Sequence, residues 1–306
     1  MMRHTVSHAP ASVWDGAIQR SEVLENARRD VDTLPVLVDP ITLLARHQNT
    51  DGGFGPRMGQ PSEPEPTALA VLGLGDARAR TWLSEHQRED GSFSTDVGPY
   101  VNDSATGLGA LALAPGAERE RALDYLESSR APRVESTAAI PIDESAIGWA
   151  WARGTASWVE PTARALWALR VARASSEGIK DAVDLLRDRE SVEGGWNYGN
   201  RVVLGEDLPP FAQTTAIALI GLSGLDPDLE SRGLDTLGRL WHVESAGGLS
   251  LATALVAFRV HDRANEARAV RAALERLVDR TRLLDDGVAL GWAALAMSAR
   301  SPEVDV

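Results

Sequence analysis

The sequence of 306 residues contains no cysteine. Disulfide bonds, thiolate zinc sites and a cysteine nucleophile are therefore all excluded. Lysine is nearly absent as well: Lys180 is the only one, and the remaining basic charge is arginine. Aromatic residues make up only 5% of the chain, yet nine of them are tryptophan. Places where tryptophans gather therefore indicate possible binding surfaces.

Long apolar runs are also missing, and no stretch approaches the ~18 apolar residues of a membrane span. Residues 1–21 show no apolar run after their first basic residue, so we expect no signal peptide and a cytoplasmic protein. The net charge of -13 argues against nucleic acid or an anionic membrane as the main partner.

A short segment recurs along the chain. Gln48 is followed by Gly52 and Phe54, and the same spacing separates Gln87, Gly91 and Phe93. Two looser copies run from Glu190 to Trp196 and from Glu244 to Leu249. Recurrence at a spacing of this kind is typical of repeat architectures.

Two kinds of helix alternate with these segments. Helices rich in Ala, Gly and Leu are apolar nearly all round, which predicts complete burial. We expect them to begin near Pro66, Asp103, Pro161, Gln213, Ser250 and Asp286. Amphipathic helices precede the glycine turns, over residues 77–87, 118–129, 178–189, 228–242 and 264–280. The alternation predicts an all-α fold, with an inner ring lining a cavity and an outer ring facing water. Residues 39–306 form this domain, and residues 1–38 form a segment with one helix near 11–27.

The Gln-x-x-x-Gly-x-aromatic signature resembles the "QW" repeat of squalene–hopene and other class II terpene cyclases. Protein-prenyltransferase β subunits share the same fold. The resemblance covers about residues 39–299 and implies an (α/α)6 toroid of six helix-pair repeats, inner and outer. The third and sixth repeats keep only the inner helix. In this family the repeated Gln bonds to backbone and the aromatic packs between outer helices, which implies structural roles for Gln48, Gln87, Phe54, Phe93 and Trp196.

The resemblance also implies that chemistry lies at the N-terminal ends of the inner helices. Class II cyclases carry Asp-x-Asp-Asp-Thr-Ala there, and the middle Asp protonates the substrate. Aligned on the Thr-Ala, Glu65, Asn102 and Glu160 fall at the acid position, and Asp103 follows one residue later. No copy has the full triplet. The candidate catalytic acids are therefore Asp103, Glu65 and Glu160. Asp103 ranks first because Asn102 and Ser104 could orient it, whereas capping and dipole compensation are the alternative for the two glutamates.

Two long connections should lie at the mouth of the cavity, and long connections in compact domains are often functional. Their tryptophans could stabilise a carbocation by cation–π attraction or simply fill the core. The candidate substrate-binding residues on them are Trp149, Trp151, Trp158, Asp143, Trp196, Tyr198, Arg201 and Gln213.

No metal or cofactor site is expected. The prenyltransferases of the resembled family bind zinc through Asp, Cys and His, but this chain has no Cys and no inner helix begins with His. Magnesium would enter only with a diphosphate substrate.

Three functional interpretations follow. The first is a terpene cyclase-like enzyme that cyclises or rearranges an isoprenoid by acid initiation in an apolar cavity. The second is a non-catalytic toroid that binds a hydrophobic ligand or a protein. The third is a different chemistry on the same scaffold, centred on Asp143 and Glu144.

Overall fold

The computed structural model describes residues 39–97, 100–172, 176–243, 247–278 and 286–299. Backbone contacts divide the chain into residues 1–37 and 38–306. The expected helix at 11–27 lies outside the described residues. The described part is mostly helical, which confirms the all-α class. Its strands form two antiparallel hairpins, β1 (Thr95–Val97) with β2 (Tyr100–Asn102) and β3 (Val202–Val203) with β4 (Glu206–Asp207).

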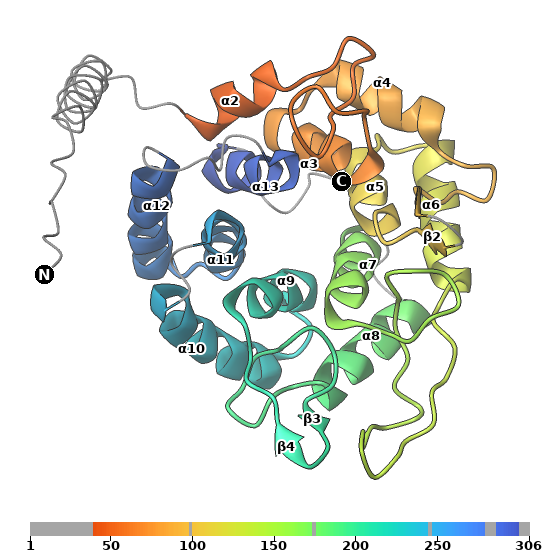
Figure 1. Cartoon of the computed structure of the whole chain (residues 1–306), viewed down its shortest axis with the longest axis vertical. Helices are drawn as coiled ribbons and strands as arrows, with labels where there is room; N and C mark the ends of the chain where they lie inside the picture. Colours follow the sequence, from red (N-terminus) through yellow and green to blue (C-terminus); the bar gives the residue numbers. More distant parts are fainter. Residues whose placement is uncertain (1–38, 98–99, 173–175, 244–246, 279–285, 300–306) are drawn as a thin grey trace, which may run out of the picture. The chain divides into compact units, whose positions relative to one another are not determined.

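Six of the helices are buried on nearly all sides. They are α3 (Pro64–Leu74), α5 (Thr106–Ala112), α7 (Val159–Ala172), α9 (Ala212–Leu222), α11 (Gly248–Val260) and α13 (Gly287–Met297). Each packs against the next, from α3 through α5, α7, α9 and α11 to α13, and α13 packs back against α3. These contacts form a closed circuit, which Figure 1 shows as the inner set of helices.

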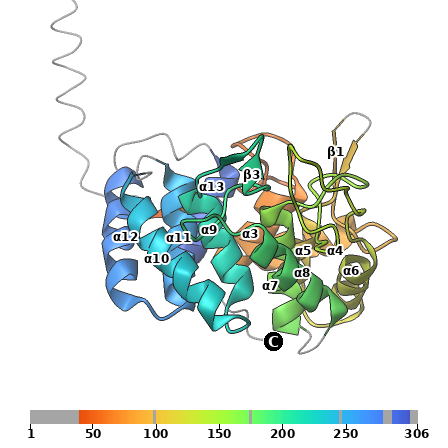
Figure 2. The same ribbon diagram turned by 90° about the horizontal axis from the view of Figure 1, so that it is seen from below.

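The other six helices cover this circuit from outside. They are α2 (Pro40–Arg46), α4 (Ala77–His86), α6 (Ala117–Ser128), α8 (Glu177–Asp188), α10 (Pro227–Val243) and α12 (Ala264–Val278). From α4 onward, each packs against the inner helix that precedes it in the chain, and α2 packs against α13 and α3. Seen from the side, the two hairpins and the long connections lie at one end of the helices (Figure 2).

Glycine allows a close approach where α13 meets α3. A Cβ on Gly291 would lie 2.6 Å from the Cβ of Leu69, and one on Gly73 would lie 2.9 Å from the backbone N of Leu295. Both distances are shorter than van der Waals contact, so a larger residue would push the two helices apart. The small-residue composition of the inner helices is therefore a packing requirement.

The recurring glutamines bind backbone. Gln48 Nε2 donates to the carbonyl of Gly52 at 3.0 Å and to Asp76 Oδ1, at the start of α4, at 2.8 Å. Gln87 Nε2 donates in the same way to the carbonyls of Gly91 and Glu118, at 3.0 and 2.8 Å. Each glutamine thus fixes a glycine turn and holds the start of the next outer helix, as buried polar groups require.

A threonine in the first turn of an inner helix bonds to the backbone of each recurring aromatic residue, an arrangement that we call the threonine clamp. The backbone N–H of Phe54 donates to Thr67 Oγ1 at 2.9 Å, and that hydroxyl reaches back to the carbonyl of Phe54 at 3.2 Å. The same N–H···Oγ1 bond joins three further pairs at 2.9–3.0 Å, namely Phe93 with Thr106, Trp149 with Thr162, and Trp196 with Thr215. Trp149 therefore occupies the aromatic position before α7. The expectation that the third repeat keeps only its inner helix is therefore wrong, because this repeat also keeps the aromatic residue.

Candidate functional site

The candidate site lies where three inner helices begin. Glu65 is in the first turn of α3, Glu160 is in the first turn of α7, and Gln213 is the second residue of α9. Helix N-termini favour negative charge, because their first N–H groups and the helix dipole point toward it. The fold thus collects two of the three candidate acids.

Arg164 joins the two glutamates. It lies one turn beyond Glu160 on α7, and its Nη2 is 2.5 Å from Glu160 Oε1 and 2.7 Å from Glu65 Oε1. Gln213 Nε2 approaches the other oxygen of Glu160, Oε2, at 3.5 Å. The guanidinium also lies over the ring of Trp151, 5.4 Å from its centroid. These five residues form what we call the Glu160 cluster.

The residues of the Glu160 cluster differ in how exposed their side chains are. The side chains of Arg164 and Glu160 are 3% and 6% exposed, whereas that of Glu65 is 25% exposed. Among the described residues, Arg164 Nε and Nη1 are buried without a hydrogen-bond partner. The buried part of the cluster therefore contains a cation, Arg164, with two nitrogen donors that make no hydrogen bond.

Burial raises the pKa of Glu160, and the nearby charge of Glu65 raises it further, against the lowering effect of Arg164. Burial alone would lower the pKa of Arg164, but Glu65 and Glu160 outweigh it and the pKa is raised. The arginine is therefore always charged. With two carboxylates and one guanidinium, the cluster is neutral when Glu160 is protonated, and desolvation favours that state.

Asp103 lies elsewhere. Tyr125 donates a short hydrogen bond to Asp103 Oδ2, and Arg153 Nε donates to the same oxygen at 3.2 Å. The pKa of Tyr125 is raised by burial and by this bond to Asp103. Asn102 and Ser104 bond to each other instead of orienting Asp103, with Ser104 Oγ 2.7 Å from Asn102 Oδ1. The adjoining cavity is about 20 Å³ and has no room for an organic substrate.

The candidate tryptophans are in different surroundings. Trp149 is 5% exposed, and its indole N–H donates to the carbonyl of Leu126 at 3.1 Å. Trp196 is fully buried, with its indole N–H 2.7 Å from the carbonyl of Leu186. Both fill the core between helices. Trp151 alone of the set belongs to the Glu160 cluster, while Trp158 is 39% exposed.

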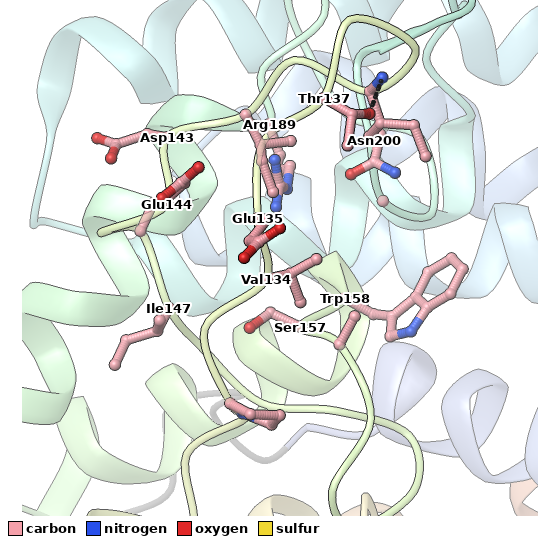
Figure 3. Close-up of a pocket in the computed structure, with 16 residues that line it drawn as sticks. Val134, Glu135, Thr137, Asp143, Glu144, Ile147, Ser157, Trp158, Arg189 and Asn200 are labelled. Atoms are coloured by element: carbon pink, nitrogen blue, oxygen red, sulfur yellow. Dashed lines mark hydrogen bonds between the residues drawn. The ribbon is translucent and has the colours of Figure 1, made fainter.

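The remaining candidates lie on the long connections. Tyr198 is 51% exposed, and its ring tilts against Phe211 with centroids 5.1 Å apart. Arg201 is exposed on the same connection. Asp143 is exposed on the first connection, where hydrogen bonds from Ser145 lower its pKa. Asp143 and Glu144 line a separate cavity (Figure 3).

Sequence reasoning missed Arg164. Its signal was a charged residue four positions after Glu160 in the buried first half of α7, since residues at i and i+4 face the same side. A charge on such a helix is costly unless it is paired, so this spacing predicts a buried pair.

The described residues contain no group of three or more His, Asp or Glu arranged to hold a metal ion. None of the described helices combines the length and the apolar character that crossing a membrane demands. No family model matches the sequence, and a search of curated proteins finds no match.

Proposed function

We propose that residues 39–306 are an (α/α)6 toroid of six helix-pair repeats, similar in architecture to class II terpene cyclases and prenyltransferase β subunits. The closed circuit of inner-helix contacts supports this proposal. The threonine clamp also supports this proposal, because it recurs at the start of α3, α5, α7 and α9. A toroid of this kind places the starts of its inner helices around one mouth, and the Glu160 cluster lies there.

The activity that the cluster favours is acid-initiated cyclisation or rearrangement of an isoprenoid. Glu160 is the acid. The observation that carries this assignment is its burial, which raises the pKa of the carboxyl, together with Arg164 at 2.5 Å, a cation already in place for the conjugate base. An acid for an alkene needs both properties.

The step balances without a cofactor. The O–H bond of Glu160 breaks as a C–H bond forms at one alkene carbon, and the other carbon becomes cationic. A second double bond of the substrate attacks that carbon and closes a ring. Loss of a proton from the final cation to a carboxylate or to water restores neutrality. The carboxylate left on Glu160 is bound by Arg164, with Gln213 on its other oxygen. Magnesium enters only if the substrate carries a diphosphate.

The test is turnover of squalene and of geranylgeranyl diphosphate, followed by gas chromatography and mass spectrometry. Glu160→Gln should abolish product formation, because the amide cannot donate a proton of comparable acidity. Glu85→Gln, on the exposed face of α4, is the matched control and should keep full activity. Circular dichroism establishes that both variants are folded. Full turnover by a folded Glu160→Gln protein would eliminate Glu160 as the acid.

A second candidate is a toroid that binds an apolar chain without converting it. The observation in its favour is that Glu160 Oε1 is already occupied by Arg164, in an arrangement that also ties α7 to α3 through Glu65. Under this alternative the wild-type protein binds the isoprenoid and forms no product. The Glu160→Gln variant then binds the isoprenoid with the same affinity as wild type.

A further inference from the structure

A second cavity lies outside the Glu160 cluster. It has a volume of about 280 Å³ and is enclosed by the first long connection, the C-terminal end of α8 and the turn at residues 199–200 (Figure 3). Small-molecule sites span roughly 300–1,000 Å³. The cavity is therefore at the lower limit for such sites and suits a compact ligand.

The wall formed by the connection is held in place by its own polar groups. The backbone N–H of Ser136 donates to Glu144 Oε1 at 2.8 Å, and that of Ile142 donates to Ser136 Oγ at 3.1 Å. The N–H of Asp143 donates to Asp188 Oδ1, at the end of α8, at 3.1 Å. These bonds fix the connection against the helix, so the cavity is formed before any ligand arrives.

Arg189 supplies a buried cation on one wall. The residue is 5% exposed, and its Nη1 pairs with Asp188 Oδ2 at 2.6 Å. Its Nε has no hydrogen-bond partner among the described residues. Burial lowers the pKa of Arg189 despite the charge of Asp188, so the pair does not fully offset the cost of desolvation. A second anionic group bound here would be stabilised.

Three carboxylates also line the cavity. Figure 3 draws Glu135, Asp143 and Glu144 among its lining residues, and no ion pair joins Glu135 to Arg189 in the described structure. Glu135 is exposed, whereas Asp143 and Glu144 use one oxygen each on backbone N–H groups of the connection. A simple anion would be repelled by these three carboxylates, and a simple cation would leave Arg189 Nε without a partner.

Much of the remaining lining is apolar and branched, although Thr137, Ser157 and Asn200 also line the cavity. Ile140, Ile142 and Ile147 are partly buried there, and Val134 and Trp158 are 42% and 39% exposed. Apolar side chains open to solvent around a small cavity favour a ligand that covers them.

We propose that this cavity binds a zwitterion of amino-acid size with a branched apolar side chain. The ligand carboxylate pairs with Arg189, its ammonium group pairs with Glu135, and its side chain covers the isoleucines and Trp158. One compact molecule thereby satisfies both charges and the apolar wall. An uncharged isoprenoid chain would satisfy only the wall, so this site is independent of the activity proposed for the Glu160 cluster.

Isothermal titration of the wild-type protein with L-leucine tests the proposal. Two analogues share the side chain: leucine methyl ester lacks the carboxylate, and 4-methylpentanoate lacks the ammonium group. Each should bind at least about tenfold more weakly than L-leucine, because each loses one of the two ion pairs proposed for the zwitterion. Equal binding of all three would overturn the proposal, as would no binding of L-leucine at ~10 mM.

Variants assign the two charges. Glu135→Gln should weaken L-leucine binding about tenfold and leave 4-methylpentanoate unaffected or bound more tightly. Arg189→Gln should abolish the preference for L-leucine over its methyl ester. Glu135 is exposed and has no ion-pair partner in the described structure, so its variant remains informative if Arg189→Gln does not fold. Glu85→Gln is the control for loss of one carboxylate. Unchanged L-leucine affinity in Glu135→Gln would contradict the assignment.

Discussion

Glu65 and Arg164 lie 99 positions apart in the sequence, and Glu65 Oε1 is 2.7 Å from Arg164 Nη2. The pair joins α3 to α7, which both pack against the intervening α5. It therefore links inner helices that are not consecutive in the circuit. The same guanidinium nitrogen also binds Glu160, so a single buried cation fixes the position of both candidate carboxylates.

Arg164 should be a large single contributor to stability. Replacing it with methionine fills similar volume but leaves Glu160 without its cation in a buried site. We expect the free energy of unfolding to fall by about 3–5 kcal/mol, the usual cost of breaking a buried pair. Urea denaturation at neutral pH measures this. Arg201→Met, at an exposed site, should change the same quantity by less than about 0.5 kcal/mol. A loss as small as the control's would mean that the pair behaves like a surface salt bridge.

Glu160 should make stability depend on pH in a defined direction. Burial raises its pKa in the folded state above the ordinary value of the unfolded chain. Between those two pKa values the folded protein binds more protons, so rising pH lowers the free energy of unfolding. The contribution is complete below the unfolded pKa and is lost as pH rises through the folded pKa. Denaturation of wild type and Glu160→Gln across about pH 4–8 isolates it, because the variant lacks this proton. Parallel curves for the two proteins would show that the pKa is not raised.

Each threonine clamp should contribute more to the free energy of unfolding than an exposed threonine hydroxyl does. Thr67→Val and Thr215→Val keep the side-chain shape but leave the buried N–H groups of Phe54 and Trp196 unpaired. Each should cost about 1–3 kcal/mol of unfolding free energy. Thr81→Val, on the exposed face of α4, is the control and should stay within about 0.5 kcal/mol of wild type. Equal effects at all three positions would mean that the clamp adds nothing.

Asp103 should matter for stability and not for turnover. Asp103→Asn removes the charged acceptor of Tyr125 and Arg153, and we expect a loss of about 1–2 kcal/mol, limited by the 46% exposure of the arginine side chain. Product formation from an isoprenoid should continue, because no hydrogen bond or ion pair joins Asp103 to the Glu160 cluster in the described structure. Tyr125→Phe should reproduce the stability loss. Lost turnover at unchanged melting temperature would instead make Asp103 the acid.

Helix positions were the most predictable feature. The inner helices begin within three residues of the expected starts, for example at Pro64 for Pro66 and at Thr106 for Asp103. Uniform apolar composition and N-terminal proline are local signals, so they can be read without knowing the partners. The strands were not predicted, because segments of two or three residues show no alternating pattern.

The site was predictable only in part. Glu65, Glu160 and Gln213 could be placed together, because each begins an inner helix. The i, i+4 spacing indicates that Arg164 pairs with Glu160, but the contact of Arg164 with Glu65 depends on how α3 and α7 meet in space, which no local pattern shows. The role of Trp149 was hidden because no glutamine marks the start of its turn. Its separation of 13 residues from Thr162 equals that of Phe54 from Thr67 and of Phe93 from Thr106, and this spacing is the signal that could have found it.

The contact between α13 and α3 has a consequence for synthesis on the ribosome. α3 is made first among the inner helices, but in the described part of the chain one of its two flanks packs against α13, residues 287–297. Until that last helix emerges, the apolar flank of α3 has no native partner and is open to non-native association. The rate at which the nascent chain escapes aggregation should therefore depend on chaperones that shield this one surface until translation reaches α13.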